Sequence, residues 1–275
     1  AIQQEVRKEE APTIANAFIY VNTISHKLDQ EFVHTIFTAL DGKVDTLPTG
    51  CLRTFVNHLA RHKHHANSQF IATCCDTLMK TSDTAKYFGH IRDWTENLLS
   101  LLHLGYTPDK QWLQTWYVVT KNNMHHFYPA YFHKALNGVA HLSRDAIDQD
   151  WLEAWLDASR EKMSRFQSKH LTQMITALVH IASRLDGYHK WTMVTQEEAW
   201  LTAWFDRCMA IFDTFPSERV MECLWAVRKL EEYEFSACKD RNMAMQWQNI
   251  CRSLHDASST HHQSHGSTST ENTEH

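Results

Sequence analysis

Three copies of one aromatic pattern constrain the fold of this 275-residue chain more than any other feature. In each copy two tryptophans stand at positions i and i+4, and a phenylalanine follows at a fixed distance. A repeat of about 40 residues is typical of stacked helical pairs, in which each pair covers the apolar face of its neighbour. The copies, which we call the aromatic pattern, are Trp112, Trp116 and Phe127; Trp151, Trp155 and Phe166; and Trp200, Trp204 and Phe215.

The apolar register continues after each phenylalanine, which shows that the repeat includes a second helix. The chain has only 7 Gly and 5 Pro, too few for a fold rich in hairpins and tight turns. We therefore predict an all-α fold, a right-handed α-solenoid of about six antiparallel helical pairs with a period near 39 residues. The matching positions are Phe132, Leu171 and Val220; Leu136, Ile175 and Leu224; Val139, Leu178 and Val227; and Leu142, Ile181 and Leu230.

Start and stop signals divide the chain into successive units of one array, residues 11–254. Gly42 and Gly105 are expected to end helices in the left-handed conformation. The third copy follows the second after 49 residues, whereas the second follows the first after 39, and we expect the additional residues in a loop around residues 186–195. The predicted segments are a polar lead-in 1–10, units 12–44, 48–80, 83–105, 108–142, 147–185 and 196–235, a capping helix 241–254, and a flexible His-rich tail 255–275.

The paired tryptophans allow a structural and a functional interpretation. Side chains at i and i+4 share one helix face, so each pair can cover the second helix of its own unit. An exposed aromatic stripe could instead stack nucleobases. Because the tryptophans alternate with Leu and Ile at helical spacing, we predict that they are core residues.

Composition and motifs exclude several classes of function. There is no apolar run of membrane-spanning length, and 7 cysteines without a C-x-x-C motif indicate reduced core thiols in an interior compartment. The 20 histidines form no complete metal-ligand set, and no catalytic or phosphate-loop motif occurs. We expect no enzyme activity, cofactor, metal site, small-molecule substrate or membrane partner.

The last three predicted pairs resemble octotricopeptide repeats, a helical-pair family of green-algal organelle proteins. The openings Pro108-Asp-Lys-Gln-Trp112, Ile147-Asp-Gln-Asp-Trp151 and Gln196-Glu-Glu-Ala-Trp200 are similar to the opening of that repeat. The segments from Thr95 to Gly105 and from Val220 to Leu230 are similar to its second helix. The resemblance implies an organellar RNA-associated protein, either an RNA maturation or stability factor or a structural ribosomal subunit.

Charge varies along the chain around a net value of −5. Residues 48–80 and 107–144 each hold four Lys or Arg against one acid, whereas residues 195–235 hold four against nine. Phosphate neutralisation supplies much of the affinity of an RNA-binding protein. The distribution favours a subunit that contacts RNA with one part and protein with another.

Basic residues near the turns between helices are the predicted phosphate contacts, and the alternative is that they only form solvated turns. The turn at residues 61–65 and the turn near residue 163 are interpreted as equivalent places in two units. The predicted RNA-binding residues are Arg53, Arg61, Lys63, Lys121, Arg160, Lys162, Arg165 and Lys169.

We expect a structural subunit of an organellar ribonucleoprotein that clamps ribosomal RNA and docks neighbouring proteins. The mitochondrial ribosome, in the mitochondrial matrix, is the favoured particle, and the plastid stroma is the alternative location. Since the chain begins with Ala1 rather than Met, we expect that a targeting segment was removed. Two other functions stay open, a protein–protein scaffold without RNA contact and a free organellar RNA maturation or stability factor. The free factor would need base contacts, for which the candidates are His133, Asn137, Thr172 and Thr176.

Overall fold

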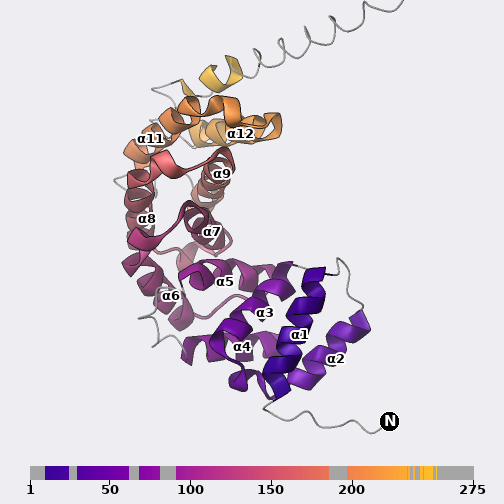
Figure 1. Ribbon diagram of the computed structural model, residues 1–275. Helices are drawn as coiled ribbons and strands as arrows, with labels where there is room; N and C mark the ends of the chain where they lie inside the picture. The colour runs from indigo at the N-terminus through magenta and orange to yellow at the C-terminus, as the bar shows by residue number, and fades with distance from the viewer. Residues whose placement is uncertain are drawn as a thin grey trace, which may run out of the picture. The chain divides into compact units, whose positions relative to one another are not determined.

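The computed structural model describes residues 10–24, 30–61, 68–80, 91–185, 197–233, 235, 238, 242–243, 245–249 and 252. Every regular element in these ranges is a helix, which confirms the predicted all-α class (Figure 1). The chain divides into two compact units, Ala1–Ala158 and Ser159–His275, and the division falls within one helix, α8. The predicted lead-in at 1–9, the loop at 186–195 and the tail at 255–275 lie outside the described residues.

The helices of the first unit are α1 (Ala11–Ile24), α2 (Gln30–Leu40), α3 (Thr49–Arg61), α4 (Ser68–Lys80), α5 (Ile91–His103), α6 (Lys110–Asn122), α7 (Pro129–Ala140) and most of α8 (Gln149–Glu161). Those of the second unit are α9 (Ser168–Arg184), α11 (Glu197–Ala210) and α12 (Ser217–Glu232). The short 3₁₀ helices are η2 (Val44–Thr46), η5 (Met124–His126), η6 (Arg144–Ala146), η7 (Met163–Arg165) and η8 (Phe212–Thr214).

A 3₁₀ turn joins the two helices of each pair α2–α3, α6–α7, α8–α9 and α11–α12. The residue after the turn is extended and buries a large apolar side chain, which fixes the direction in which the second helix begins. These residues are Leu47, Phe127, Phe166 and Phe215, each less than a tenth exposed. The phenylalanine of the aromatic pattern is therefore the residue that sets the corner of each pair.

The pair α2–η2–α3 contains a fourth, weakened copy of the aromatic pattern. Phe32, Ile36 and Leu47 have the same spacing as the two tryptophans and the phenylalanine, with aliphatic side chains at two of the three places. From sequence we grouped α3 with α4 in residues 48–80, whereas the order helix–3₁₀–helix groups α3 with α2. Gly42 lies between α2 and α3 at φ 67°, and Gly105 follows α5 at φ 76°, which confirms both left-handed helix ends.

The tryptophans of the aromatic pattern are buried, as predicted. The second tryptophan of each first helix donates its ring N–H to a backbone carbonyl near the start of the preceding second helix. These hydrogen bonds run from Trp116 to Trp94 (2.8 Å) and from Trp155 to Phe132 (3.0 Å) in the first unit, and from Trp204 to Leu171 (3.0 Å) in the second.

In the second and third copies the first tryptophan donates instead to a hydroxyl of the preceding first helix. Trp151 Nε1 lies 2.8 Å from Thr120 Oγ1, and Trp200 Nε1 lies 2.7 Å from Ser159 Oγ. The spacing predicted contact with the second helix of the same pair, but these hydrogen bonds reach the preceding pair. One pair alone has too little apolar surface to enclose a tryptophan, so each pair is completed by its neighbour.

Second helices pack against one another in sequence. In the first unit α1, α3, α5 and α7 form successive contacts, and in the second α9 packs against α12 (Figure 1). The contact between α5 and α7 is close because Gly138 faces Leu98, where an added Cβ would lie 3.0 Å from Leu98 Cδ2. Ser100, Ala177 and Ala226 are small residues at the same place in α5, α9 and α12.

Part of the predicted capping helix 241–254 is described. Residues 243 and 245–249 are helical, and Trp247 is fully buried. Its ring lies 6.3 Å from that of Trp204, 5.7 Å from Phe212 and 5.8 Å from Phe215. The segment thus covers the last copy of the aromatic pattern, as the prediction required.

Candidate nucleic-acid interface

The turn η7 in the second unit carries the densest group of predicted phosphate contacts. Met163 is buried beneath the turn and anchors it, while Arg165 is exposed and Lys162 is half-buried. Arg160 lies in the last turn of α8, and Lys169 is exposed in the first turn of α9. We call Arg160, Lys162, Arg165 and Lys169 the η7 patch.

Electrostatics shows that cations are crowded at this turn. Burial lowers the pKa of Lys162, the nearby charge of Arg165 lowers that pKa further, and Glu161 opposes the shift. Burial also lowers the pKa of His170, and so does the adjacent charge of Lys169. Two basic groups with pKa values lowered in part by like charges indicate a local positive potential, which attracts an anion.

Hydrogen bonds hold the backbone beneath the η7 patch. Arg207 of α11 donates from Nε and Nη2 to the carbonyl oxygen of Phe166, at 3.2 Å each. Gln167 and His170 form a reciprocal cap at the start of α9, in which the backbone N–H of Gln167 donates to His170 Nδ1 at 3.3 Å. The patch therefore presents its charges from a fixed turn, which lowers the entropy lost when an anion binds.

The predicted phosphate contacts of the first unit differ in their exposure. Arg53 is only 4% exposed, so the prediction that it contacts phosphate at the surface is wrong. The reason is that α3 lies between α1 and α5, which bury most of its circumference. Arg61 at the end of α3 and Lys121 near the end of α6 are both exposed, and Lys63 lies outside the described residues.

The predicted recurrence of basic charge at one equivalent turn holds for Lys121, which lies before η5 as Arg160 lies before η7, and is wrong for Arg61. Arg61 ends a second helix, whereas the η7 patch surrounds the turn between a first and a second helix. The turns that correspond to η7 hold Asp45 in η2, His125 and His126 in η5, and Asp213 in η8. The grouping of four basic residues at η7 is thus a local feature of one pair.

A recurring histidine at the end of the second helices was not predicted from the sequence. His103 ends α5 and His141 directly follows α7, and their rings lie 5.6 Å apart, edge to face. His180 is the corresponding residue of α9 and lies 6.2 Å from the exposed ring of Trp225. The signal was available, because His141 immediately precedes Leu142 and His180 precedes Ile181 in the register used to find the repeat.

The four residues considered for base contacts do not all reach the surface. His133 is 6% exposed and Thr172 is 1% exposed, which contradicts a role for either in reading bases. Asn137 and Thr176 are partly exposed, and Thr176 Oγ1 donates to the carbonyl oxygen of Thr172 at 2.9 Å. These side chains offer little for sequence-specific readout.

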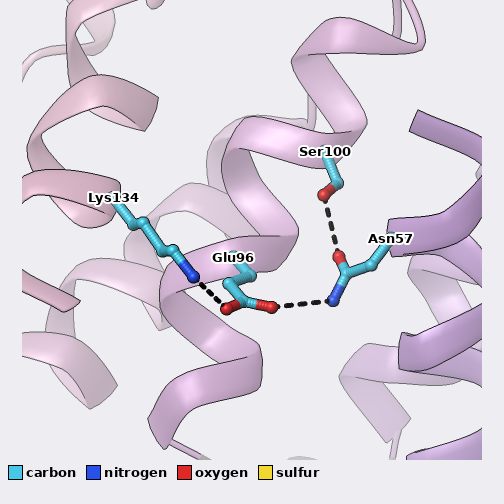
Figure 2. Close-up of polar contacts among 4 residues, drawn as sticks. All are labelled: Asn57, Glu96, Ser100 and Lys134. Carbon is cyan, nitrogen blue, oxygen red and sulfur yellow. Dashed lines mark hydrogen bonds and ion pairs between the residues drawn. The ribbon is translucent and has the colours of Figure 1, made fainter. Parts of the chain in front are cut away.

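A polar network occupies the exposed side of the second helices in the first unit. Figure 2 shows Glu96 of α5 between Lys134 of α7 and Asn57 of α3. Asn57 Nδ2 lies 3.3 Å from Glu96 Oε2, and Ser100 Oγ donates to Asn57 Oδ1 at 2.8 Å. Glu96 pairs with Lys134, which neutralises this lysine and makes it a weak phosphate ligand.

A hollow of 530 Å³ lies in the first unit between α6 and the loop before α8. Lys110, Asp145 and Asp148 line it, so it carries both signs of charge and does not favour an anion. Within the described residues no cluster of three His, Cys, Asp or Glu could hold a metal ion. None of the helices described is long and apolar enough to cross a membrane.

No protein-family model matches the chain, and no curated protein is significantly similar to it. The octotricopeptide resemblance therefore rests on the segments quoted above alone.

Proposed function

We propose that the protein is a non-catalytic helical-repeat subunit of an organellar ribonucleoprotein that binds the RNA backbone through the η7 patch. The observation that carries the proposal is the crowding of Lys162 and Arg165 on a turn held in place by Arg207. A fixed cluster of cations binds phosphate without reading sequence. The buried base-contact candidates agree with such sequence-independent binding.

The proposal includes the architecture of a single α-solenoid of about six pairs. Its support is that both units contain the same tryptophan hydrogen bonds to a preceding pair. Such nearest-neighbour contacts are the basis of solenoid stability. The organellar setting, with the mitochondrial ribosome favoured, is carried over from the octotricopeptide resemblance.

Salt-dependent RNA binding tests the phosphate contact. With three phosphates neutralised on single-stranded RNA, affinity should fall about 20-fold between 50 and 200 mM salt. Replacing Arg165 and Lys169 by Glu should abolish most of this binding, because both side chains are exposed. The matched control is Lys110→Glu, an exposed lysine of the first unit outside the predicted RNA contacts, which should leave the affinity within about twofold. An equal loss in the control, or no RNA binding at low salt, would refute the assignment of the η7 patch.

Sedimentation of native extract tests the subunit proposal separately. A ribosomal subunit should migrate with ribosomal particles after a high-salt wash, whereas a free maturation factor should stay in the light fractions. The alternative of a protein–protein scaffold is favoured by the nine acids in residues 195–235. That alternative predicts crosslinks to proteins and none to RNA.

A further inference from the structure

One register position, the same in each second helix, marks the side of the helix that faces the next second helix. It follows the first core residue of the helix and is occupied by Arg53 in α3, Thr95 in α5 and Thr172 in α9. All three are buried, at 4%, 0% and 1% exposure. Thr172 Oγ1 lies 3.5 Å from Cys223 Sγ of α12, so this side is covered by the next second helix.

The same position in α12 is Met221, and it is 56% exposed. Trp225 stands one turn later on the same helix and is 43% exposed. Within the described residues no second helix packs after α12, so the side that is covered in α3, α5 and α9 is open here. Large apolar side chains gathered on an open helix face mark an interaction site.

The end of the chain covers a different part of the last pair. Trp247 packs on Trp204 of α11 and on Phe212 and Phe215, which continues the layer of first helices. Residues 253–275 contain only Leu254 and Ala257 as apolar residues, so that stretch has no apolar stripe with which to cover Met221. The described residues around Trp247 therefore leave Met221 and Trp225 of α12 exposed.

Charge identifies the chemistry of a helix that would cover this side of α12. Glu218 precedes Met221 by three residues, Glu222 precedes Trp225 by three, and both carboxylates are exposed. Arg228, one turn further on, donates to Gln248 Oε1 at 3.2 Å. Carboxylates beside the apolar residues repel RNA phosphates and attract Lys and Arg.

We propose that the α12 face, made of Glu218, Met221, Glu222 and Trp225, docks a cationic amphipathic helix of a partner protein. The apolar stripe of that helix covers Met221 and Trp225, and its flanking Lys or Arg residues pair with the two glutamates. The docked helix takes the place that a further second helix would occupy. This interaction does not depend on RNA binding by the η7 patch.

A pair of synthetic peptides tests the proposal with the full chain. Both peptides are helical, about 18 residues long, and carry the same leucine stripe; one has Lys on its flanks and the other Glu. The Lys peptide should bind at least about tenfold more tightly than the Glu peptide, since like charges across an interface are strongly disfavoured. Glu218→Lys with Glu222→Lys should reverse that preference.

Substitutions on the face provide the second part of the test. Trp225→Ala should weaken binding of the Lys peptide at least about tenfold, as expected for a buried aromatic anchor. Val118→Ala is the matched control, because Val118 is an apolar side chain of α6 that is 57% exposed. Circular dichroism of each variant should match the parent, since the substituted side chains are exposed.

Three results would overturn the proposal. Equal affinity for both peptides, or no effect of Trp225→Ala, would show that charge and the aromatic anchor do not select the partner. Self-association of the chain that Met221→Glu abolishes would identify a second copy as the occupant. Competition between RNA and the Lys peptide that Trp225→Ala relieves would identify the face as an RNA surface.

Discussion

The replacement Thr120→Val tests whether the hydrogen bonds of the tryptophans hold successive pairs together. Thr120 Oγ1 accepts from Trp151 Nε1 at 2.8 Å, and both residues are essentially unexposed. Valine has nearly the same shape, so packing around the site is kept while the acceptor is lost. The indole N–H is then left buried without a partner, which costs about 1–3 kcal/mol. The hydroxyl also donates to the carbonyl oxygen of Trp116, an acceptor already used by the helix, so we expect about 2 kcal/mol in total.

Urea denaturation followed by circular dichroism measures this loss. For a unit of this size the urea dependence is about 2 kcal/mol per M, so the midpoint of the first unit should fall by about 1 M. Thr115→Val is the matched control, because Thr115 lies on the same helix, is partly exposed, and donates only to Gln111 of its own helix. A Thr120→Val midpoint equal to that of Thr115→Val would refute the view that these hydrogen bonds stabilise the contact between pairs.

Three further predictions follow from the same structure. Ser159→Ala removes the acceptor of Trp200 Nε1 and should lower the stability of the second unit by about 1–3 kcal/mol in the same urea assay, while an unchanged midpoint would contradict it. Gly138→Leu should destabilise the first unit by about 3 kcal/mol because its side chain would meet Leu98, whereas Gly50→Ala, with open space around it, should be neutral or stabilising by up to about 1 kcal/mol. His170→Gln should reduce the loss of stability between pH 8 and pH 5. Burial and Lys169 lower the pKa of His170 in the folded chain, so the unfolded chain takes up the proton more readily and stability falls as pH drops below about 6.5. An unchanged pH dependence of the urea midpoint would contradict this reasoning.

Sequence predicted best where the aromatic pattern is strong. The burial of Trp116, Trp155 and Trp204 and the all-α class follow directly from tryptophans at helical spacing beside aliphatic residues. The grouping of the N-terminal helices into pairs could not be predicted in this way. Phe32, Ile36 and Leu47 stand where the other copies have two tryptophans and a phenylalanine, so the tryptophan signal is absent. Counting apolar positions cannot distinguish these from any other amphipathic helix.

The candidate interface was predictable only in part. The cations around η7 are adjacent in the sequence, so their grouping could be read directly. The burial of Arg53 could not, because a single sequence shows one apolar stripe and does not show that α3 has neighbours on both sides. The open side of α12 could not be predicted from the sequence either. It is recognised only when the exposure of Met221 is compared with that of the buried Thr172, which holds the same position in α9.

The direction of the tryptophan hydrogen bonds has a consequence for biosynthesis. In each indole hydrogen bond described above, the acceptor lies 22 to 41 residues earlier in the chain. When a first helix leaves the ribosome that synthesises it, the acceptors of its tryptophans have therefore already been made. The protein can be assembled from its N-terminus, one pair at a time, without waiting for later segments. Shortening the chain from its C-terminus removes donors together with their helices, whereas shortening it from the N-terminus leaves buried donors without acceptors, so the first kind of truncation should be the better tolerated.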